Sequence, residues 1–177
     1  MKKKTLALVL ALTLLVAGVV GSTLAWLTDQ TAEVKNTFTV GDINIGLTET
    51  TTDYKMVPGN TIAKDPTVTV KANSEACWLF VKVTKSTDLK DFITYAIAEG
   101  WTALPGVDGV YYREVPASAA DQPFSVLKGD AVTVNSDVTK EMLTAKDFAN
   151  PTLTFKAYAV QKDNVASASD AWAKVNP

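Results

Sequence analysis

A two-residue alternation of apolar and polar side chains runs through most of the chain after residue 25, and it constrains the fold more than any other feature. Successive side chains of a β-strand point to opposite faces of a sheet, so this period is typical of half-buried strands. Thr67–Lys71 has Val68 and Val70 in one phase. Cys77–Thr84 is apolar in both phases at its start, which predicts a strand covered on both faces.

Turn signals separate these runs and limit where strands can end. Pro58-Gly59 predicts a tight turn, because proline fixes φ at the first central position and glycine accepts a positive φ at the second. At Gly41-Asp42 the apolar phase slips by one residue, as a β-bulge would produce. Further strands are predicted at Trp26–Val40, Ile43–Leu47, Gly100–Leu104, Val110–Val115, Ala131–Asn135 and Thr152–Gln161.

Three short segments follow a helical period instead. One covers Leu89–Ile93, with Asp88 expected as its N-cap, and another covers Thr139–Phe148. The third covers Ala168–Val175 and begins with a Ser-x-x-Asp capping box at Ser167. Many short strands and few helices predict an all-β fold, an antiparallel β-sandwich with one or two short helices.

The first 25 residues have the features of a secretory signal peptide. Lys2–Lys4 precede the apolar stretch Leu6–Val20, and Thr23 and Ala25 are the small residues expected before a cleavage site between Ala25 and Trp26. This divides the chain into a signal peptide, residues 1–25, and one domain, residues 26–177. The alternative is an uncleaved anchor, since Thr5–Thr28 is long enough to cross a bilayer as a helix.

The net charge of the chain limits the kinds of partner that we expect it to bind. The formal net charge is −2, and removal of the basic segment Lys2–Lys4 makes the mature chain more acidic. An acidic surface gives no electrostatic reason to bind nucleic acid or an anionic membrane, so we expect neither as a partner after cleavage.

Several blocks of residues resemble a known family. Ala25–Asp29 and Asn36–Ile43 are similar to the start of proteins with a SipW-dependent signal peptide, the family of the TasA and camelysin-like (CalY) biofilm matrix proteins. The later blocks Pro58–Asn60, Cys77–Val83 and Ala157–Gln161 fit the same family. The resemblance implies cleavage by a dedicated signal peptidase near Ala25. It also implies a jelly-roll-like sandwich and a secreted or cell-surface matrix role in a Gram-positive bacterium. In TasA-like fibres the N-terminal segment of one subunit completes the sheet of the next.

Catalytic chemistry has little support in the sequence. The chain has no histidine, so Ser-His-Asp and Cys-His arrangements and the HExxH zinc motif are excluded, and we expect no enzyme and no cofactor. The single cysteine, Cys77, is expected to be buried, with an intermolecular disulfide as the alternative. The acids Asp53, Asp108 and Asp121 are scattered over loops without calcium-binding spacing, and we expect them to be solvated.

Two functions remain open at this point. The first is a self-assembling matrix subunit, whose partner is itself or a related matrix protein. Its N-terminal strand would pair within its own domain or add to a neighbour's sheet edge. The proposed assembly residues on one face of that strand are Trp26, Ala32, Val34, Phe38 and Val40.

The second is a non-polymerising cell-surface module that binds a glycan or a fibre partner. Its basis would be a platform of aromatic side chains, although core and cross-strand packing is the expected role of these residues. They are Trp78, Phe80, Trp101, Tyr111 and Tyr112.

Overall fold

The computed structural model describes residues 3, 41–51, 54–145 and 148–175. The signal segment, the cleavage site at Ala25 and Trp26, and the proposed assembly strand up to Val40 lie outside these residues. All strands described below belong to the compact unit Val40–Pro177. Within the described residues, no helix has both the length and the apolar character needed to cross a membrane.

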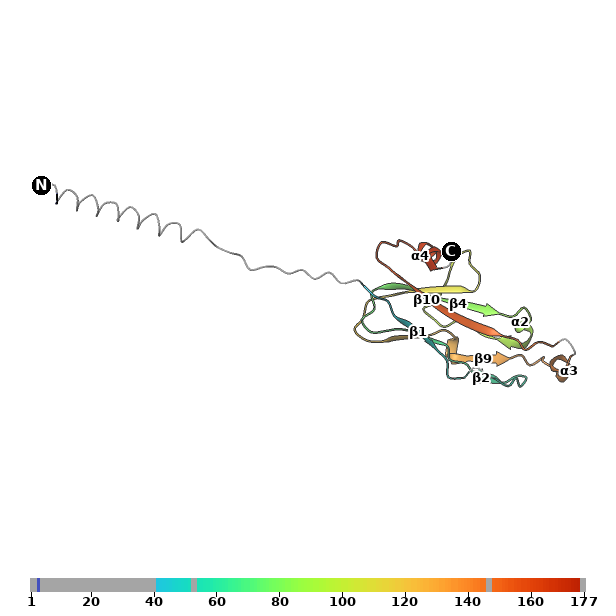
Figure 1. The fold of residues 1–177 in the computed structure, drawn as a ribbon. Coiled ribbons are helices and arrows are strands. Elements are labelled where there is room, and N and C mark those ends of the chain that lie inside the picture. Colours follow the sequence, from blue (N-terminus) through green and yellow to red (C-terminus); the bar gives the residue numbers. More distant parts are fainter. Residues whose placement is uncertain (1–2, 4–40, 52–53, 146–147, 176–177) are drawn as a thin grey trace. The chain divides into compact units, whose positions relative to one another are not determined.

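The unit is an antiparallel all-β fold, as the alternation predicted, with three sheets and only short helices among the described residues (Figure 1). The strands are β1 (Ile45–Thr48), β2 (Thr61–Ala63), β3 (Thr67–Val70), β4 (Cys77–Lys85), β5 (Ile93–Thr94), β6 (Thr102–Ala103), β7 (Val110–Val115), β8 (Gln122–Ser125), β9 (Ala131–Val134) and β10 (Leu153–Gln161). The helices are α2 (Leu89–Phe92), η1 (Lys128–Asp130, a 3-10 turn), α3 (Lys140–Leu143) and α4 (Ala168–Val175).

Two sheets enclose the main core. One has the order β10-β4-β7-β6, with β10 and β4 side by side in Figure 1, and the other has the order β1-β3-β8. The inward residues of β4, among them Leu79 and Val81, pack with Val68 and Val70 of β3, and all four are at most 1% exposed. Each buried aliphatic side chain of this kind contributes about 1.5–3 kcal/mol to folding.

The third sheet, in the order β2-β9-β5, continues the layer of β3 and β8. The strand pair β2–β9 is separated from the pair β3–β8 by an irregular step, where Lys64–Pro66 lies opposite the longer stretch Val126–Asp130. Two backbone hydrogen bonds close this step, from Lys64 N–H to Asp130 O at 2.8 Å and from Val126 N–H to Pro66 O at 2.9 Å. Gly129 and Asp130 adopt positive φ angles of 67° and 49°, which take up the extra residues.

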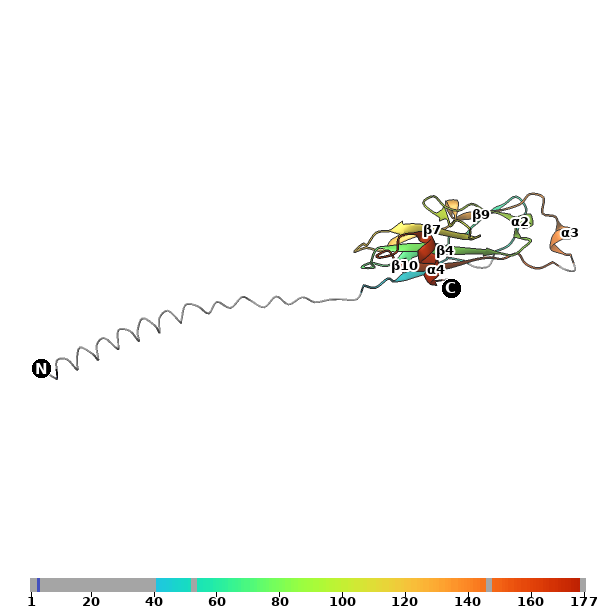
Figure 2. The same ribbon diagram turned by 90° about the horizontal axis from the view of Figure 1, so that it is seen from above.

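Helix α4 covers the outer face of β4 and β10 (Figure 2). The indole ring of Trp172 lies 5.3 Å from the ring of Phe80 and 5.1 Å from that of Tyr158, measured between centroids. The expected capping box begins the helix, because the Asp170 N–H donates to Ser167 Oγ at 3.1 Å. β4 is therefore buried on both faces, as its sequence predicted.

Some local predictions were wrong. Asp88 makes no side-chain capping hydrogen bond, and Ile93 begins β5 opposite Val134 instead of continuing the helix. The helix expected over Thr139–Phe148 spans only Lys140–Leu143, although Thr139 caps it through the Met142 N–H. The strands β2, β5 and β8 were not predicted, because β2 and β5 have only three and two residues and β8 contains Pro123. The turn at Pro58-Gly59 is confirmed, with φ of 74° at Gly59.

We predict that Trp172→Ala lowers the free energy of unfolding by about 3–5 kcal/mol, because it leaves a cavity over Phe80 and Tyr158. Urea unfolding of the mature chain measures this. Lys174→Ala, an exposed change in the same helix, is the control and should shift stability by at most about 0.5 kcal/mol. Equal effects of the two changes would mean that α4 does not cover β4.

Candidate functional site

Two edge strands meet on one side of the sandwich, which we call the open side. β1 ends one sheet and β10 ends the facing sheet, so within the described residues each pairs with a strand on one flank only. Ile45 of β1 and Phe155 of β10 pack against the same core. Unpaired edge backbone can accept a further strand. The open side therefore exposes two neighbouring edges to pairing.

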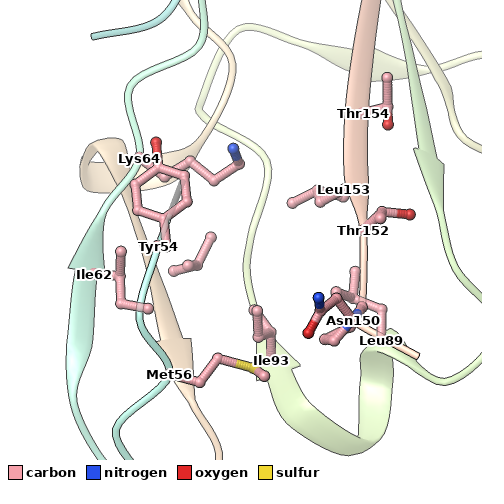
Figure 3. Close-up of a pocket in the computed structure, with 12 residues that line it drawn as sticks. Tyr54, Met56, Ile62, Lys64, Leu89, Ile93, Asn150, Thr152, Leu153 and Thr154 are labelled. Carbon is pink, nitrogen blue, oxygen red and sulfur yellow. The ribbon is translucent and has the colours of Figure 1, made fainter. Parts of the chain in front are cut away.

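Two cavities lie along the open side. The larger, of about 420 Å³, has Tyr54, Met56 and Ile62 on one wall and Leu153 of β10 on the opposite wall (Figure 3). The smaller, of about 370 Å³, lies between β1 and the start of β10. The two cavities share the side chains of Lys64, Leu153 and Thr154. We call them together the open-side groove.

A buried ion pair stands where the two cavities meet. Lys64 Nζ lies 2.5 Å from Glu49 Oε1, and the side chains are 9% and 15% exposed. The strand period places both groups inside. Lys64 lies one residue after β2, in phase with Ile62 and the buried Pro66, and Glu49 lies one residue after β1, in phase with Ile45. The pair therefore occupies positions that apolar side chains hold elsewhere in the core.

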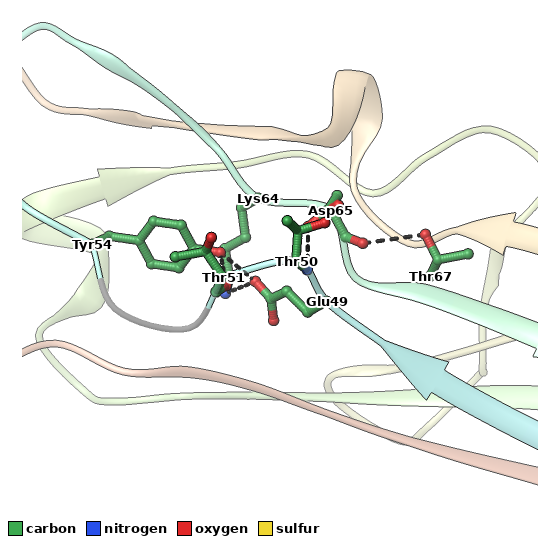
Figure 4. A network of polar contacts seen from close by, with 7 residues as sticks. All are labelled: Glu49, Thr50, Thr51, Tyr54, Lys64, Asp65 and Thr67. Atoms are coloured by element: carbon green, nitrogen blue, oxygen red, sulfur yellow. Dashed lines mark hydrogen bonds and ion pairs between the residues drawn. The ribbon is translucent and has the colours of Figure 1, made fainter.

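Tyr54, drawn in Figure 4, and the Phe155 ring complete the surroundings of this pair. Lys64 Nζ lies 4.8 Å from the ring centroid of Tyr54 and 5.4 Å from that of Phe155, which favours the ammonium by cation–π attraction. The Tyr54 hydroxyl donates to Glu49 Oε1 at 2.7 Å and also contacts Thr51 O. Burial, the hydrogen bond to Glu49 and the nearby carboxylates raise the pKa of Tyr54, so its hydroxyl stays a donor.

A second contact fixes the segment after β1 to the segment after β2. The backbone N–H of Thr50 donates to Asp65 Oδ1 at 3.0 Å, and the Thr50 hydroxyl donates to Asp65 Oδ2 at 2.5 Å. These bonds to the charged carboxylate, first the hydroxyl and then the backbone N–H, lower the pKa of Asp65. Together with the Lys64–Glu49 pair they connect the segment after β1 to the segment after β2.

The opposite side of the sandwich is covered. There Trp101 Nε1–H donates to the backbone carbonyl of Ser125 in β8 at 2.9 Å. The Arg113 guanidinium of β7 stacks on the Phe124 ring at 3.9 Å and lies 5.4 Å from the Trp101 ring. Burial lowers the pKa of Arg113. The indole occupies an edge carbonyl and the guanidinium bridges β7 and β8, which covers this sheet edge, so we call this the closed side.

The structure separates the five aromatic residues predicted as a platform or as core. Trp78, Phe80 and Tyr112 pack beneath α4, whereas Trp101 and Tyr111 belong to the core on the other face of the same sheet. They do not form one platform, and the prediction of packing is confirmed. Cys77 is buried as predicted, and burial raises the pKa of its thiol to about 11.

The predicted loop acids do not gather. Asp121 pairs with Lys71 Nζ at 3.0 Å and accepts the Ala72 N–H at 2.8 Å, Asp108 is exposed, and Asp53 lies outside the described residues. No group of three or more potential metal ligands forms in the part of the chain that the structure describes.

Glu49 and Lys64 of the open-side groove were not predicted from the sequence. The alternation of Ile62, Pro66 and Val68 placed Lys64 in the inward phase, and this signal could have found it.

Comparison of the chain with protein-family models, with curated proteins and with solved structures found no significant match. The likeness to the TasA and camelysin family therefore rests on the sequence motifs alone.

We predict that Glu49→Gln lowers the free energy of unfolding by about 3 kcal/mol, because it leaves the Lys64 ammonium buried without a counter-charge. The double change Glu49→Gln with Lys64→Met should restore most of the loss, since it removes both charges. Urea unfolding of the two variants checks this. The exposed pair Lys71–Asp121 is the control, and Asp121→Asn should cost at most about 1 kcal/mol. A double variant as unstable as the single one would contradict this account.

The lowered pKa of Asp65 predicts a pH dependence. Its contribution to stability is complete above the carboxyl's ordinary pKa, and it is lost as the pH falls through the lower folded-state pKa. Chemical unfolding from neutral pH to about pH 2 should therefore show a smaller loss of stability for Asp65→Asn than for the parent chain. Thr50→Val, which removes the hydroxyl donor, should shift the curve in the same sense. Parallel curves for parent and variants would contradict the role of this contact.

Proposed function

We propose that this chain is a secreted structural subunit of an extracellular or cell-surface matrix, which assembles into fibres through its N-terminal strand. The strand of one subunit adds to the open side of the next, and the partner is a second copy or a related matrix protein. A dedicated signal peptidase removes the export segment between Ala25 and Trp26.

The single observation that carries the proposal is the pair of edge strands, β1 and β10, on one side of the sandwich, with the open-side groove along them. The opposite edge is covered by Trp101 and Arg113. A subunit with one open and one covered side can add strands in one direction only. This asymmetry supports linear growth over growth into a sheet.

The chain just after the proposed assembly strand supports a fixed starting point for that strand. The Glu75 N–H donates to Asp42 O at 3.1 Å, and the Lys71 N–H donates to Asn44 O at 2.8 Å. The chain is thus anchored to the domain from Asp42 onward. A strand that ends at Val40 can then pair with its own domain or with a neighbour. Both choices satisfy the same backbone groups, so concentration decides between them.

We predict that mature Trp26–Pro177 forms filaments visible by electron microscopy, and that Phe38→Asp prevents them. Phe38 lies on the apolar face of the assembly strand, and loss of a buried phenylalanine should raise the critical concentration more than about a hundredfold. Thr39→Asp is the matched control, because it adds the same charge on the other face of the strand and should leave filaments intact.

Two results would overturn the proposal. One is a monomeric parent chain under all conditions of salt, pH and concentration. The other is equal filament formation by Phe38→Asp and the parent chain, because it would remove the strand from the contact.

A further inference from the structure

A third cavity, of about 360 Å³, lies beside α2, and no residue of β1 lines it. Lys85 at the end of β4, Lys90 of α2, Thr94 of β5 and the two tyrosines Tyr95 and Tyr111 line it. Leu89, Ile93 and Ile97 supply its apolar wall. Leu89 and Ile93 also line the larger cavity of the open-side groove, but the lysines and tyrosines do not.

The charged groups of this cavity have one sign. Its lining contains two ammonium groups and no carboxylate. Among the residues that the structure describes, the ion pairs involve Lys64, Lys71 and Lys162. Lys85 and Lys90 take part in none of them. Two unpaired cations beside one cavity favour an anionic ligand.

The tyrosines add flat apolar faces and hydroxyl groups. Tyr95 and Tyr111 are both half-buried and pack against the main core, so their rings are held in place. Burial, Tyr111 and the nearby Asp108 raise the pKa of Tyr95, and its hydroxyl remains a hydrogen-bond donor. Fixed aromatic faces with a few polar groups are typical of ligand sites.

From this combination we propose that the cavity formed by Lys85, Lys90, Tyr95 and Tyr111 binds a carboxylated sugar unit of an acidic polysaccharide. The sugar ring lies against the tyrosine rings, and its carboxylate pairs with the two ammonium groups. The volume is at the low end of the roughly 300–1,000 Å³ of ligand sites, which fits a single unit of a chain rather than a large ligand. The cavity is open to solvent, so the neighbouring units of the polysaccharide can lie outside it.

The ring and the charge are separate requirements, and they distinguish this partner from other polyanions. A polyphosphate or an acidic polypeptide offers the charge without a saccharide ring for the tyrosines. A neutral polysaccharide offers the ring without a carboxylate for the lysines. Lys85, Lys90, Tyr95 and Tyr111 do not line the open-side groove, so binding of the sugar does not require assembly into fibres.

The test is calorimetric titration of the mature chain with oligogalacturonate, a carboxylated sugar oligomer. We expect binding that is lost when its carboxylates are methyl-esterified and that polyglutamate does not reproduce. Lys85→Gln with Lys90→Gln should raise Kd at least about tenfold, as expected for removal of charge-assisted hydrogen bonds. Both side chains are exposed, so the fold should be retained.

The matched control is Lys82→Gln with Lys156→Gln. These lysines lie opposite each other on β4 and β10 and line none of the three cavities. The control variant therefore loses the same charge at a site outside the proposed cavity. Their loss should change Kd less than about threefold, because salt screens charges that lie away from the bound ligand. No binding of oligogalacturonate, equal binding of polyglutamate, or equal effects of the two double variants would each overturn the proposal.

Discussion

Burial of β4 on both faces is the constraint on which the rest of the structure depends. Its inward residues face β3, and its outward residues Trp78 and Phe80 lie beneath α4. The same strand pairs with β10 on one flank and β7 on the other. A strand so enclosed cannot be an edge, so the edges of its sheet fall on β10 and β6, where contact with other molecules becomes possible.

The two sides of the sandwich differ in what protects them. On the closed side, Trp101 occupies the Ser125 carbonyl and Arg113 stacks on Phe124. On the open side, Lys64 points inward beside the exposed edges, where it keeps a charge in the groove. An inward charge of this kind discourages indiscriminate edge pairing. The Lys64–Glu49 pair places two charges where apolar side chains would pack without the cost of removing charge from water.

The sequence predicted the elements whose signal is local and strong. β3 and β4 followed from alternation, and the start of α4 followed from the capping box at Ser167. β8 could not be predicted in this way. It contains Pro123, and it is a strand because β3 pairs with it and because Phe124 packs on the core. Ile93 had helical spacing, but its pairing with Val134 outweighed a weak local preference.

Only part of the candidate site could be predicted from the sequence. Glu49 and Lys64 lie in inward phases. A charged residue at such a position is normally taken to belong to a solvent-exposed loop, unless its buried partner is known. The pairing of two segments far apart in the chain supplies that information. The expected packing of the five aromatic residues was confirmed, but the sequence did not show that they lie on opposite faces of one sheet.

Hydrogen–deuterium exchange of the mature chain, unassembled and assembled, tests the central claim most directly. Addition of a neighbour's strand at the open side would slow exchange of backbone amides in β1 or β10 and leave those of β8 unchanged. Increased protection of β8 alone would place the contact on the closed side and contradict the account.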